Sequence, residues 1–562
     1  MTLVVATSAK SKIKRRRAKK LKTCPTKRAR RRMSAKAKAR LKAQGCRPRR
    51  PHPKQAPRAG GTTPAAILPP PSAPQGPAPK VPAPPKPPAP ATVPDLPPAP
   101  EQPPGPDQPP PPPPPDRPAP VTGAPVYGGT FGRREAERLL WRAGFGPRPG
   151  DVDRLVGLGL EAAVHELTRP SGQAKLSGPA GHDEGEPLSP TDAWGHDHLY
   201  WLDRMVRSDQ QLVERLALVF HDWFATSLDG VGSQRLMLAQ TNLFRAEGLG
   251  NFHRLVRGIT QDGAMCIFLD AVSNDRWGIN ENYARELMEL FTLGAGSDAY
   301  TEHDVRELAR SLSGWSGDWS SEEGWHNFRW EWERWDAGIK TVFGQTGRWD
   351  WEAACRMVVE HPKHAGFFVR KLWSYFVAVP PPDATAAALE ALYVDSGGEI
   401  RPVVEAILCS PELYTGPAMV KPPVVAAAGM LRAVGGAVDG GWWWWNAAEA
   451  GQRLYLPPDV AGWREDRWLD TSTVRGRWQV VSSLLYERAL DPEDDYPAET
   501  PAQAVAAALA FWGNPPLADD TREALVAWAG RVMPARPYAS LHPQRQNALR
   551  QLIGACPDYQ TS

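Results

Sequence analysis

Residues 51–126 constrain the fold more than any other stretch, because more than two in five of them are proline. The segment holds 33 prolines in 76 positions, including an unbroken run over residues 109–115. This composition has little apolar surface to bury and favours an extended spacer of the polyproline-II type. We therefore predict a disordered proline-rich linker over 51–126, with the folded part starting near Tyr127.

Residues 1–50 are strongly basic. They hold 21 Lys and Arg and no Asp or Glu, so the net charge of +5 combines +21 here with −16 in the rest of the chain. Like charges at this density repel, which predicts a disordered polybasic tail. Its expected partner is a polyanion or an anionic surface: acidic lipid, nucleic acid or a cell-wall polymer. A solubilising tail without a partner is the other interpretation. The acidic remainder is a poor candidate for wrapping nucleic acid.

Neither the apolar runs nor the cysteines fix a compartment. No run reaches the roughly 18 apolar residues of a membrane span. Only residues 3–6 are apolar before the charges begin, whereas an ordinary signal peptide has an apolar core of about 7–15 residues after its basic residues. The six cysteines form no C-x-x-C pair and have no histidine at zinc-site spacing. Free thiols are expected, and a disulfide between Cys24 and Cys46 is the alternative that the sequence leaves undecided. No metal site is predicted, and the sequence leaves cofactors and oligomeric state unknown.

Helical periodicity dominates from Tyr127 to the end of the sequence, and strand-like alternation is nearly absent. This predicts a mainly α protein with one large helical domain over 127–562. Residues 315–351 depart from the pattern because they carry eight tryptophans and several glycines, so we expect an irregular excursion there, with a short hairpin as one option. The predicted helices cover residues 133–143, 151–168, 199–207, 212–224, 234–247, 252–261, 280–294, 302–313, 351–360, 362–376, 384–393, 401–408, 422–434, 474–489, 501–511, 521–532 and 543–553.

The predicted helix over 280–294 carries the densest polar face. Asn280 suits its N-cap and Gly294 suits a left-handed C-terminal turn. Spacing alone favours a solvated ladder of charged side chains. The alternative is a cleft lined by this face. On that alternative the candidate catalytic residues are Arg285, Glu286 and Glu289, and the candidate binding residues are Asn280 and Asn282.

Two further polar positions are candidates. His221 stands beside Asp222 at the end of an apolar helix, where an imidazole serves as a base, a ligand or a helix cap. We include His221 as a candidate catalytic residue. Asp270 and Asn274 precede the 280–294 helix, and Asp270 is a candidate binding residue, although turn roles explain both.

Tryptophan provides the last candidates. Four consecutive indoles at Trp442–Trp445 cannot all point inward, so we expect some exposed ring surface, with Trp442 and Trp443 as candidate binding residues. Exposed tryptophan suits stacking on a glycan or docking to a protein partner. Filling of gaps between helices is the competing interpretation.

The sequence lacks the motifs of easily recognised enzymes. There is no P-loop, no G-x-G-x-x-G after a strand, no G-x-S-x-G and no H-E-x-x-H. This excludes the most familiar classes and leaves unfamiliar ones open.

The body resembles the bacterial family known as domain of unknown function 1800, over about residues 131–480 and onward. The motifs carrying the resemblance are LLWRAGFG (139–146), LALVFHDWFATS (216–227), LGNF (249–252), NENYARELMELFTLG (280–294), YTE (300–302), KTVFGQTG (340–347), RKLW (370–373) and PDVAGW (458–463). The resemblance implies a large helical domain, often in exported proteins, without an established activity. Two departures bear on metal binding, because the family's H-x-H appears here as His221-Asp222-Trp223 and its His-Asp as Trp335-Asp336.

Two functional hypotheses follow. The first is a binding or scaffold protein that its basic tail tethers to an anionic surface. The second is a hydrolase-like enzyme with a polar cleft around His221 and the 280–289 helix. The missing histidines favour the first, and the concentration of polar motifs favours the second.

Overall fold

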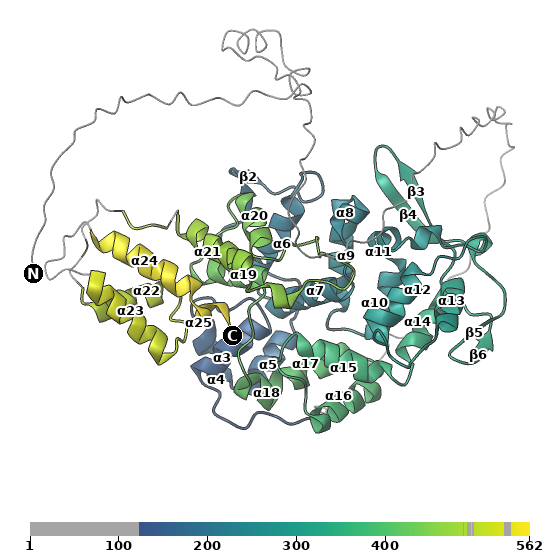
Figure 1. The fold of residues 1–562 in the computed structure, drawn as a ribbon, viewed down its shortest axis with the longest axis horizontal. Coiled ribbons are helices and arrows are strands. Elements are labelled where there is room, and N and C mark those ends of the chain that lie inside the picture. The colour runs from purple at the N-terminus through teal and green to yellow at the C-terminus, as the bar shows by residue number, and fades with distance from the viewer. Residues whose placement is uncertain (1–122, 487, 492–495, 497–498, 533–540) are drawn as a thin grey trace, which may run out of the picture. The chain divides into compact units, whose positions relative to one another are not determined.

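The computed structural model describes residues 123–562, except residues 487, 492–495, 497–498 and 533–540. Within this part the chain is mainly α-helical, as predicted (Figure 1). The predictions for the basic tail, residues 1–50, and for the linker up to residue 122 lie outside the described residues.

Helices make up most of the described part. The first half contains α3 (Arg133–Arg142), α4 (Asp151–Leu158), α5 (Leu160–Thr168), α6 (His196–Arg207), α7 (Gln211–Trp223), α8 (Leu228–Val231), α9 (Gln234–Glu247), α10 (Phe252–Gln261), α11 (Gly263–Phe268), α12 (Asn282–Glu286) and α13 (Glu302–Ser311). The second half contains α14 (Trp351–Val359), α15 (His364–Ser374), α16 (Asp383–Asp395), α17 (Ile400–Cys409), α18 (Pro411–Thr415), α19 (Pro423–Ala433), α20 (Trp442–Glu449), α21 (Thr471–Tyr486), α22 (Pro501–Phe511), α23 (Asp519–Val532), α24 (His542–Ala555) and α25 (Pro557–Gln560).

The short elements are 3-10 turns, one π-helix and three antiparallel hairpins. The 3-10 turns are η1 (Ala271–Ser273), η3 (Trp332–Arg334) and η4 (Glu465–Arg467), and η2 (Leu287–Thr292) is the π-helix. The hairpins are β1 (His182–Asp183) with β2 (Glu186–Pro187), β3 (Trp315–Ser320) with β4 (Gly324–Trp330), and β5 (Lys340–Val342) with β6 (Gln345–Gly347). The predicted irregular excursion over 315–351 therefore consists of two hairpins and a turn.

Helix α7 lies at the centre of the packing. It contacts α5, α6 and α9, and its apolar residues Leu212, Leu216 and Phe220 are fully buried. At its C-terminal end the rings of Trp223 and Phe224 pack against Phe252, which belongs to α10. Helices α22, α23 and α24 form a separate group that α21 joins to the rest (Figure 1).

Local sequence signals explain many helix ends. The side chain of Asn251 caps α10 by accepting hydrogen bonds from the backbone N–H groups of His253 and Arg254. Thr301 and Asp304 form a capping box at the start of α13. Such caps satisfy donors that the first helical turn leaves unpaired.

Three predicted boundaries were wrong. The helix expected over 151–168 is broken at Gly159, whose positive φ of 79° separates α4 from α5. Residues Trp442–Trp445, which lie outside the predicted helices, belong to helix α20. The helix expected over 280–294 is α-helical only over α12 and continues as the π-helix η2.

The π-helix changes what the 280–294 segment presents. The hydroxyl of Thr292 donates to the carbonyl of Leu287, five residues earlier, and the segment ends at Gly294 with a φ of 93°. Tyr283, Leu287 and Phe291 are buried, as the predicted apolar face requires. The predicted cap Asn280 accepts from the backbone N–H of Asn282, while the helix proper begins after Glu281.

Candidate functional site

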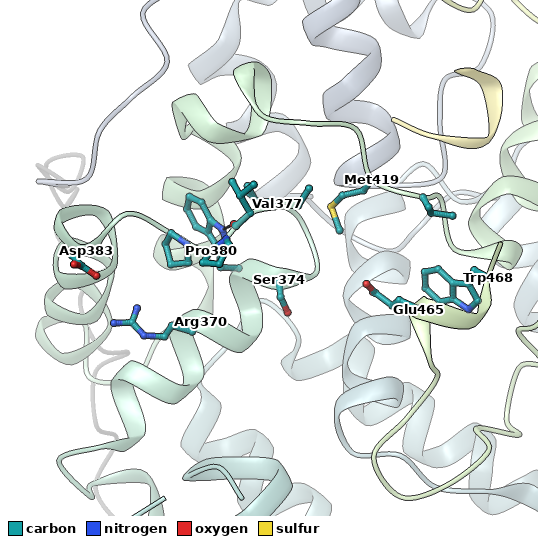
Figure 2. A pocket seen from close by; sticks show the side chains of 13 residues that line it. Arg370, Ser374, Val377, Pro380, Asp383, Met419, Glu465 and Trp468 are labelled. Carbon is teal, nitrogen blue, oxygen red and sulfur yellow. Dashed lines mark hydrogen bonds between the residues drawn. The ribbon is translucent and has the colours of Figure 1, made fainter. Parts of the chain in front are cut away.

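A cavity of about 790 Å³ lies beside the C-terminal end of α15. Figure 2 shows residues from α15 and the loop after it on one side, and Met419, Glu465 and Trp468 on the other. The lining residues are Arg370, Trp373, Ser374, Val377, Ala378, Val379, Pro380, Pro381, Asp383, Met419, Val420, Glu465 and Trp468.

The lining is mainly apolar, with a few charged groups. Arg370 and Asp383 lie at one end, and the carboxyl group of Glu465 points into the space from the opposite side (Figure 2). The indole of Trp373 donates to the carbonyl of Val379 at 2.7 Å, which holds the loop that forms one wall. Cavities of this size with apolar walls and a few polar groups are typical of small-molecule sites.

A smaller inner pocket adjoins this cavity. The two share Met419, Val420, Glu465 and Trp468. The inner pocket has a volume of about 10 Å³, room for one water molecule. Its other lining residues are Trp141, Arg142, Arg215, Tyr375, Lys421, Pro422 and Ser562.

Asp222 joins three distant segments next to these pockets. One carboxylate oxygen accepts from the Tyr375 hydroxyl at 2.8 Å, and the other accepts from the backbone N–H of Trp463 at 2.6 Å. Gly462 has a φ of 96°, and a Cβ there would lie 2.3 Å from the Asp222 carboxylate, so this position requires glycine. Burial raises the pKa of Asp222. Both of its oxygens are engaged, which favours a positioning role over a reactive one.

Positive charge surrounds the inner pocket. Burial lowers the pKa of Arg142 to about 9 and that of Arg215 to about 10, so both stay charged at neutral pH. Burial also lowers the pKa of Lys421, whose ammonium lies 3.5 Å from the centre of the Trp141 ring. Glu465 is exposed to the cavity, yet protein atoms around it, and then the Asp222 carboxylate, raise its pKa.

His221 lies in an aromatic enclosure and does not reach the cavity. Its ring is fully buried, with the rings of Trp201, Tyr455 and Trp463 centred 5.4 to 5.5 Å away. Neither ring nitrogen makes a hydrogen bond of normal geometry, although the Gln240 side chain lies near enough to oppose the lowering of the His221 pKa. Burial lowers the pKa of His221 to about 3, so the imidazole is neutral at physiological pH.

The polar face of the 280–289 segment has a different setting. Arg285 forms ion pairs with Glu281, Glu289 and Glu302 at 3.2, 3.2 and 2.7 Å. All four side chains are at least a quarter exposed. In the part of the chain that the structure describes, no hydrogen bond, ion pair or ring contact links His221 to residues 280–289. The structure thus places the predicted catalytic residues His221 and Arg285 in separate surroundings.

The remaining predicted residues of this region shape turns. Glu286 is partly buried, and burial raises its pKa. Asp270 is exposed and adopts a left-handed conformation with a φ of 55° before η1. The amide of Asn280 donates to the Ser273 hydroxyl, and Asn282 is exposed at the start of α12.

The tryptophan run is divided between core and surface. Trp443 is buried and donates to Asp439 at 2.8 Å, and Trp442 is partly buried with its ring centre 4.1 Å from that of Trp443. Trp445 is 57% exposed, and Trp194 is 68% exposed. Some indole surface is therefore exposed, as expected, but it belongs to Trp445 and Trp194 rather than Trp443.

A family model described as "Protein of unknown function (DUF1800)" matches residues 138–561. The chain belongs to the DUF1800 family. No curated protein and no solved structure matches it. The matched range contains the whole lining of both pockets except the terminal Ser562.

The motifs by which the DUF1800 chain resembles its family meet at this site. Arg142 belongs to the LLWRAGFG motif, Asp222 to the HDW motif, and Trp463 to PDVAGW. The 280–294 motif contributes through its C-terminal end, where the carbonyl of Leu290 accepts from Lys371 at 2.8 Å. The motifs are thus joined mainly by buried contacts, while the ladder on α12 faces outward.

Sequence reasoning missed Arg142, Arg215, Tyr375 and Glu465. One signal was available for Arg215, since it interrupts the apolar face of α7 seven residues before Asp222, two turns away on the same side. A charged residue on a buried helix face needs a partner or a ligand, which makes it a candidate site residue. Tyr375 and Glu465 gave no local signal, because only the fold brings them near α7.

The Trp335-Asp336 pair has a structural role here. Trp335 is buried, with the ammonium of Lys340 lying 4.5 Å from its ring centre, and Asp336 pairs with Arg310 at 2.7 Å. Within the described residues, no group of three or more His, Cys, Asp or Glu side chains is placed to hold a metal ion. No helix among them is long and apolar enough to cross a bilayer.

Proposed function

We propose that this protein is a binding protein: the cavity beside α15 takes a small organic ligand, and the basic residues 1–50 hold the chain at an anionic surface. The observation that carries the first part is the cavity of about 790 Å³ with apolar walls and few charged groups. Burial of a ligand's apolar body supplies affinity there, and the charged ends supply orientation.

The condition of the polar residues favours binding over hydrolysis. A general base needs to reach the proton that it removes. The imidazole of His221 is enclosed by aromatic rings, and the carboxylate of Asp222 is occupied by two donors. Arg285 is engaged by Glu281, Glu289 and Glu302 in an exposed cluster of ion pairs. The hydrolase alternative around His221 and the 280–289 helix has no comparable support.

The tail part of the proposal rests on charge. With 21 basic and no acidic residues in 50 positions, the segment is attracted to any anionic surface, and salt screens this attraction.

A cavity-filling variant tests the ligand proposal. We expect that some members of a library of small organic acids, phosphate esters and sugars raise the unfolding temperature of the full chain. Ser374→Trp places an indole in the cavity, where it obstructs the ligand, and abolishes these shifts. Ala506→Trp, at an exposed position of α22, is the matched control and keeps them. A library without any stabilising member, or shifts that survive Ser374→Trp, would count against the cavity.

A vesicle assay tests the tail. The full chain is expected to sediment with vesicles containing anionic lipid, to stay in solution with neutral ones, and to detach as salt rises. A full-length variant with the 21 basic residues replaced by glutamine is expected to lose this binding. Binding that survives the replacement would show that the anchor lies elsewhere.

A further inference from the structure

Arg215 is a buried cation without a partner. Its side chain is 5% exposed, and it makes no hydrogen bond or ion pair with any described residue. Among the described residues, four other arginines are about as deeply buried. Arg142, Arg432 and Arg477 donate hydrogen bonds, whereas Arg545 has a 4.0 Å contact with Glu499 and two donors without a partner. The guanidinium of Arg215 thus lacks the hydrogen bonds that three comparably buried arginines make, and a charge removed from water without a partner destabilises the native state.

The acidic residues near Arg215 do not pair with it. Its neighbour Glu214 is bound by Arg204 and Arg245 at 2.7 and 2.9 Å. Asp222 is held by Tyr375 and Trp463. Glu465 is close enough to affect Arg215 electrostatically, but forms no ion pair with it. Arg215 thus lines the inner pocket without an ion-pair partner among the described residues, and its Nε is buried without a hydrogen bond.

The inner pocket connects this guanidinium to the main cavity. Arg215 and Arg142 line it, and its shared residues Met419, Val420 and Trp468 also line the larger space. A volume of about 10 Å³ admits one oxygen-sized group. A ligand whose body lies in the cavity can thus place a terminal oxygen beside Arg215.

We propose that Arg215 is the anchor for an oxyanion, a carboxylate or phosphate group, at the end of the ligand that the cavity takes. The inner pocket admits one oxygen of such a group, and the guanidinium donates a charge-assisted hydrogen bond to it while the rest of the group stays in the larger cavity. Arg142 adds a second positive charge, although its own donors are bound to the carbonyl of Phe376 and to Ser562. Glu465 lines both pockets, so its carboxylate opposes a bound anion. This inference rests on the proposed function.

The competing explanation is that Arg215 is a structural residue, paired in solution with Glu465 or with water. The two explanations differ for Arg215→Met. If Arg215 awaits an anion, a neutral side chain of similar length removes an unpaired charge, and the protein without ligand is as stable as before or more so. If Arg215 is structural, the same variant is destabilised.

The test compares thermal unfolding of the full chain in inorganic phosphate, in acetate and in chloride at equal ionic strength. Phosphate or acetate is expected to raise the midpoint by about 2 °C over chloride, and the stronger of the two identifies the source of the oxyanion. Arg215→Met abolishes the rise and leaves the midpoint in chloride unchanged or higher. Arg432→Met is the matched control, because Arg432 is equally buried but donates to the carbonyls of Gly146 and Val206. It lowers the midpoint and keeps the anion effect.

Three results would overturn the inference: equal midpoints in all salts, an anion effect that survives Arg215→Met, or a drop in chloride as large as that of Arg432→Met. Should Arg215→Met not fold, the variant Glu465→Gln distinguishes between the anion site and the structural role. Removal of the opposing charge is expected to strengthen phosphate binding several-fold, whereas weaker binding or a lower midpoint in chloride assigns Glu465 as the structural partner. Small anions still reach Arg215 if the cavity takes no organic ligand. A phosphate effect without library hits therefore supports the anion site and counts only against the cavity proposal.

Discussion

The charged face of α12 and the charged face of α7 look alike in sequence but have opposite surroundings. Glu281, Arg285 and Glu289 follow one another at four-residue spacing, and they pair with each other in water. Arg215 and Asp222 lie two turns apart on α7 and depend on side chains from elsewhere. The first set forms its ladder within one segment, with Glu302 of α13 as its one added partner in the described residues. The second set acquires its neighbours only when the helices assemble.

The comparison shows why a dense polar motif is a weak guide to a site. Adjacent opposite charges on a helix neutralise one another locally, and such exposed pairs contribute little to stability. A lone charge on an apolar stripe is more informative, because its burial requires a partner or a ligand. The four predictions below test this contrast, in order of decreasing effect.

Removal of the Asp222 carboxylate is expected to have the largest effect. Asp222→Ala leaves the Tyr375 hydroxyl and the Trp463 N–H without their acceptor and lowers the free energy of unfolding by about 2–4 kcal/mol. Asp222→Asn, which retains one carbonyl acceptor, is expected to lose about half as much. Urea unfolding of the full chain measures both. A loss under about 1 kcal/mol for Asp222→Ala would mean that the junction is not structural.

Replacement of His221 is expected to change the acid sensitivity of the protein. Its pKa is about 3 in the folded chain and near 6.5 when unfolded, so the unfolded state takes up the proton first as pH falls. Stability is therefore lost below about pH 6.5, at up to about 1.4 kcal/mol per pH unit down to about pH 3. His221→Phe fills the same aromatic enclosure and removes this contribution.

Urea unfolding between pH 7 and pH 4 is the measurement for His221→Phe. Buried His364, whose pKa is lowered to about 4, and Asp262, whose pKa is raised to about 6, remain in both proteins and contribute to the residual slope. Identical pH profiles for the variant and the parent would show that the imidazole of His221 is not enclosed as described.

Loss of the Tyr375 hydroxyl is expected to have a smaller effect. Tyr375→Phe removes one donor to Asp222 while the Trp463 N–H remains, which costs about 1 kcal/mol. In the Asp222→Ala background the same change is expected to cost nothing, because the shared hydrogen bond is already absent. A double-mutant cycle checks this. Additive losses of stability would show that the two side chains do not interact.

Disruption of the α12 ladder is expected to have the smallest effect. Arg285→Met shifts the urea midpoint less than any change above, because its partners Glu281, Glu289 and Glu302 are exposed. The shift is expected to vanish near 1 M salt, where the screening length is about 3 Å. A shift as large as that of Asp222→Ala, insensitive to salt, would reverse the contrast between the two helices.

The helical periodicity of the sequence was sufficient to predict most of the longer helices. The helices 234–247, 252–261 and 501–511 were predicted with the bounds that α9, α10 and α22 have, because amphipathic spacing and caps are local properties. The π-helix η2 and helix α20 were not predicted. The hydrogen bonds of η2 span five residues, and the four tryptophans adopt a helical conformation. Both features depend on packing against other helices rather than on local preference.

What the sequence determined by itself is the class of the protein: a mainly α domain of the DUF1800 family, preceded by a basic and a proline-rich segment. What only the tertiary structure decided is which charges face water and which face a cavity. Tyr375 and Trp463 stand 153 and 241 residues from Asp222, so no spacing along the chain reports their contact. Burial is a property of the assembled helices, and burial is what distinguishes Arg215 from Arg285.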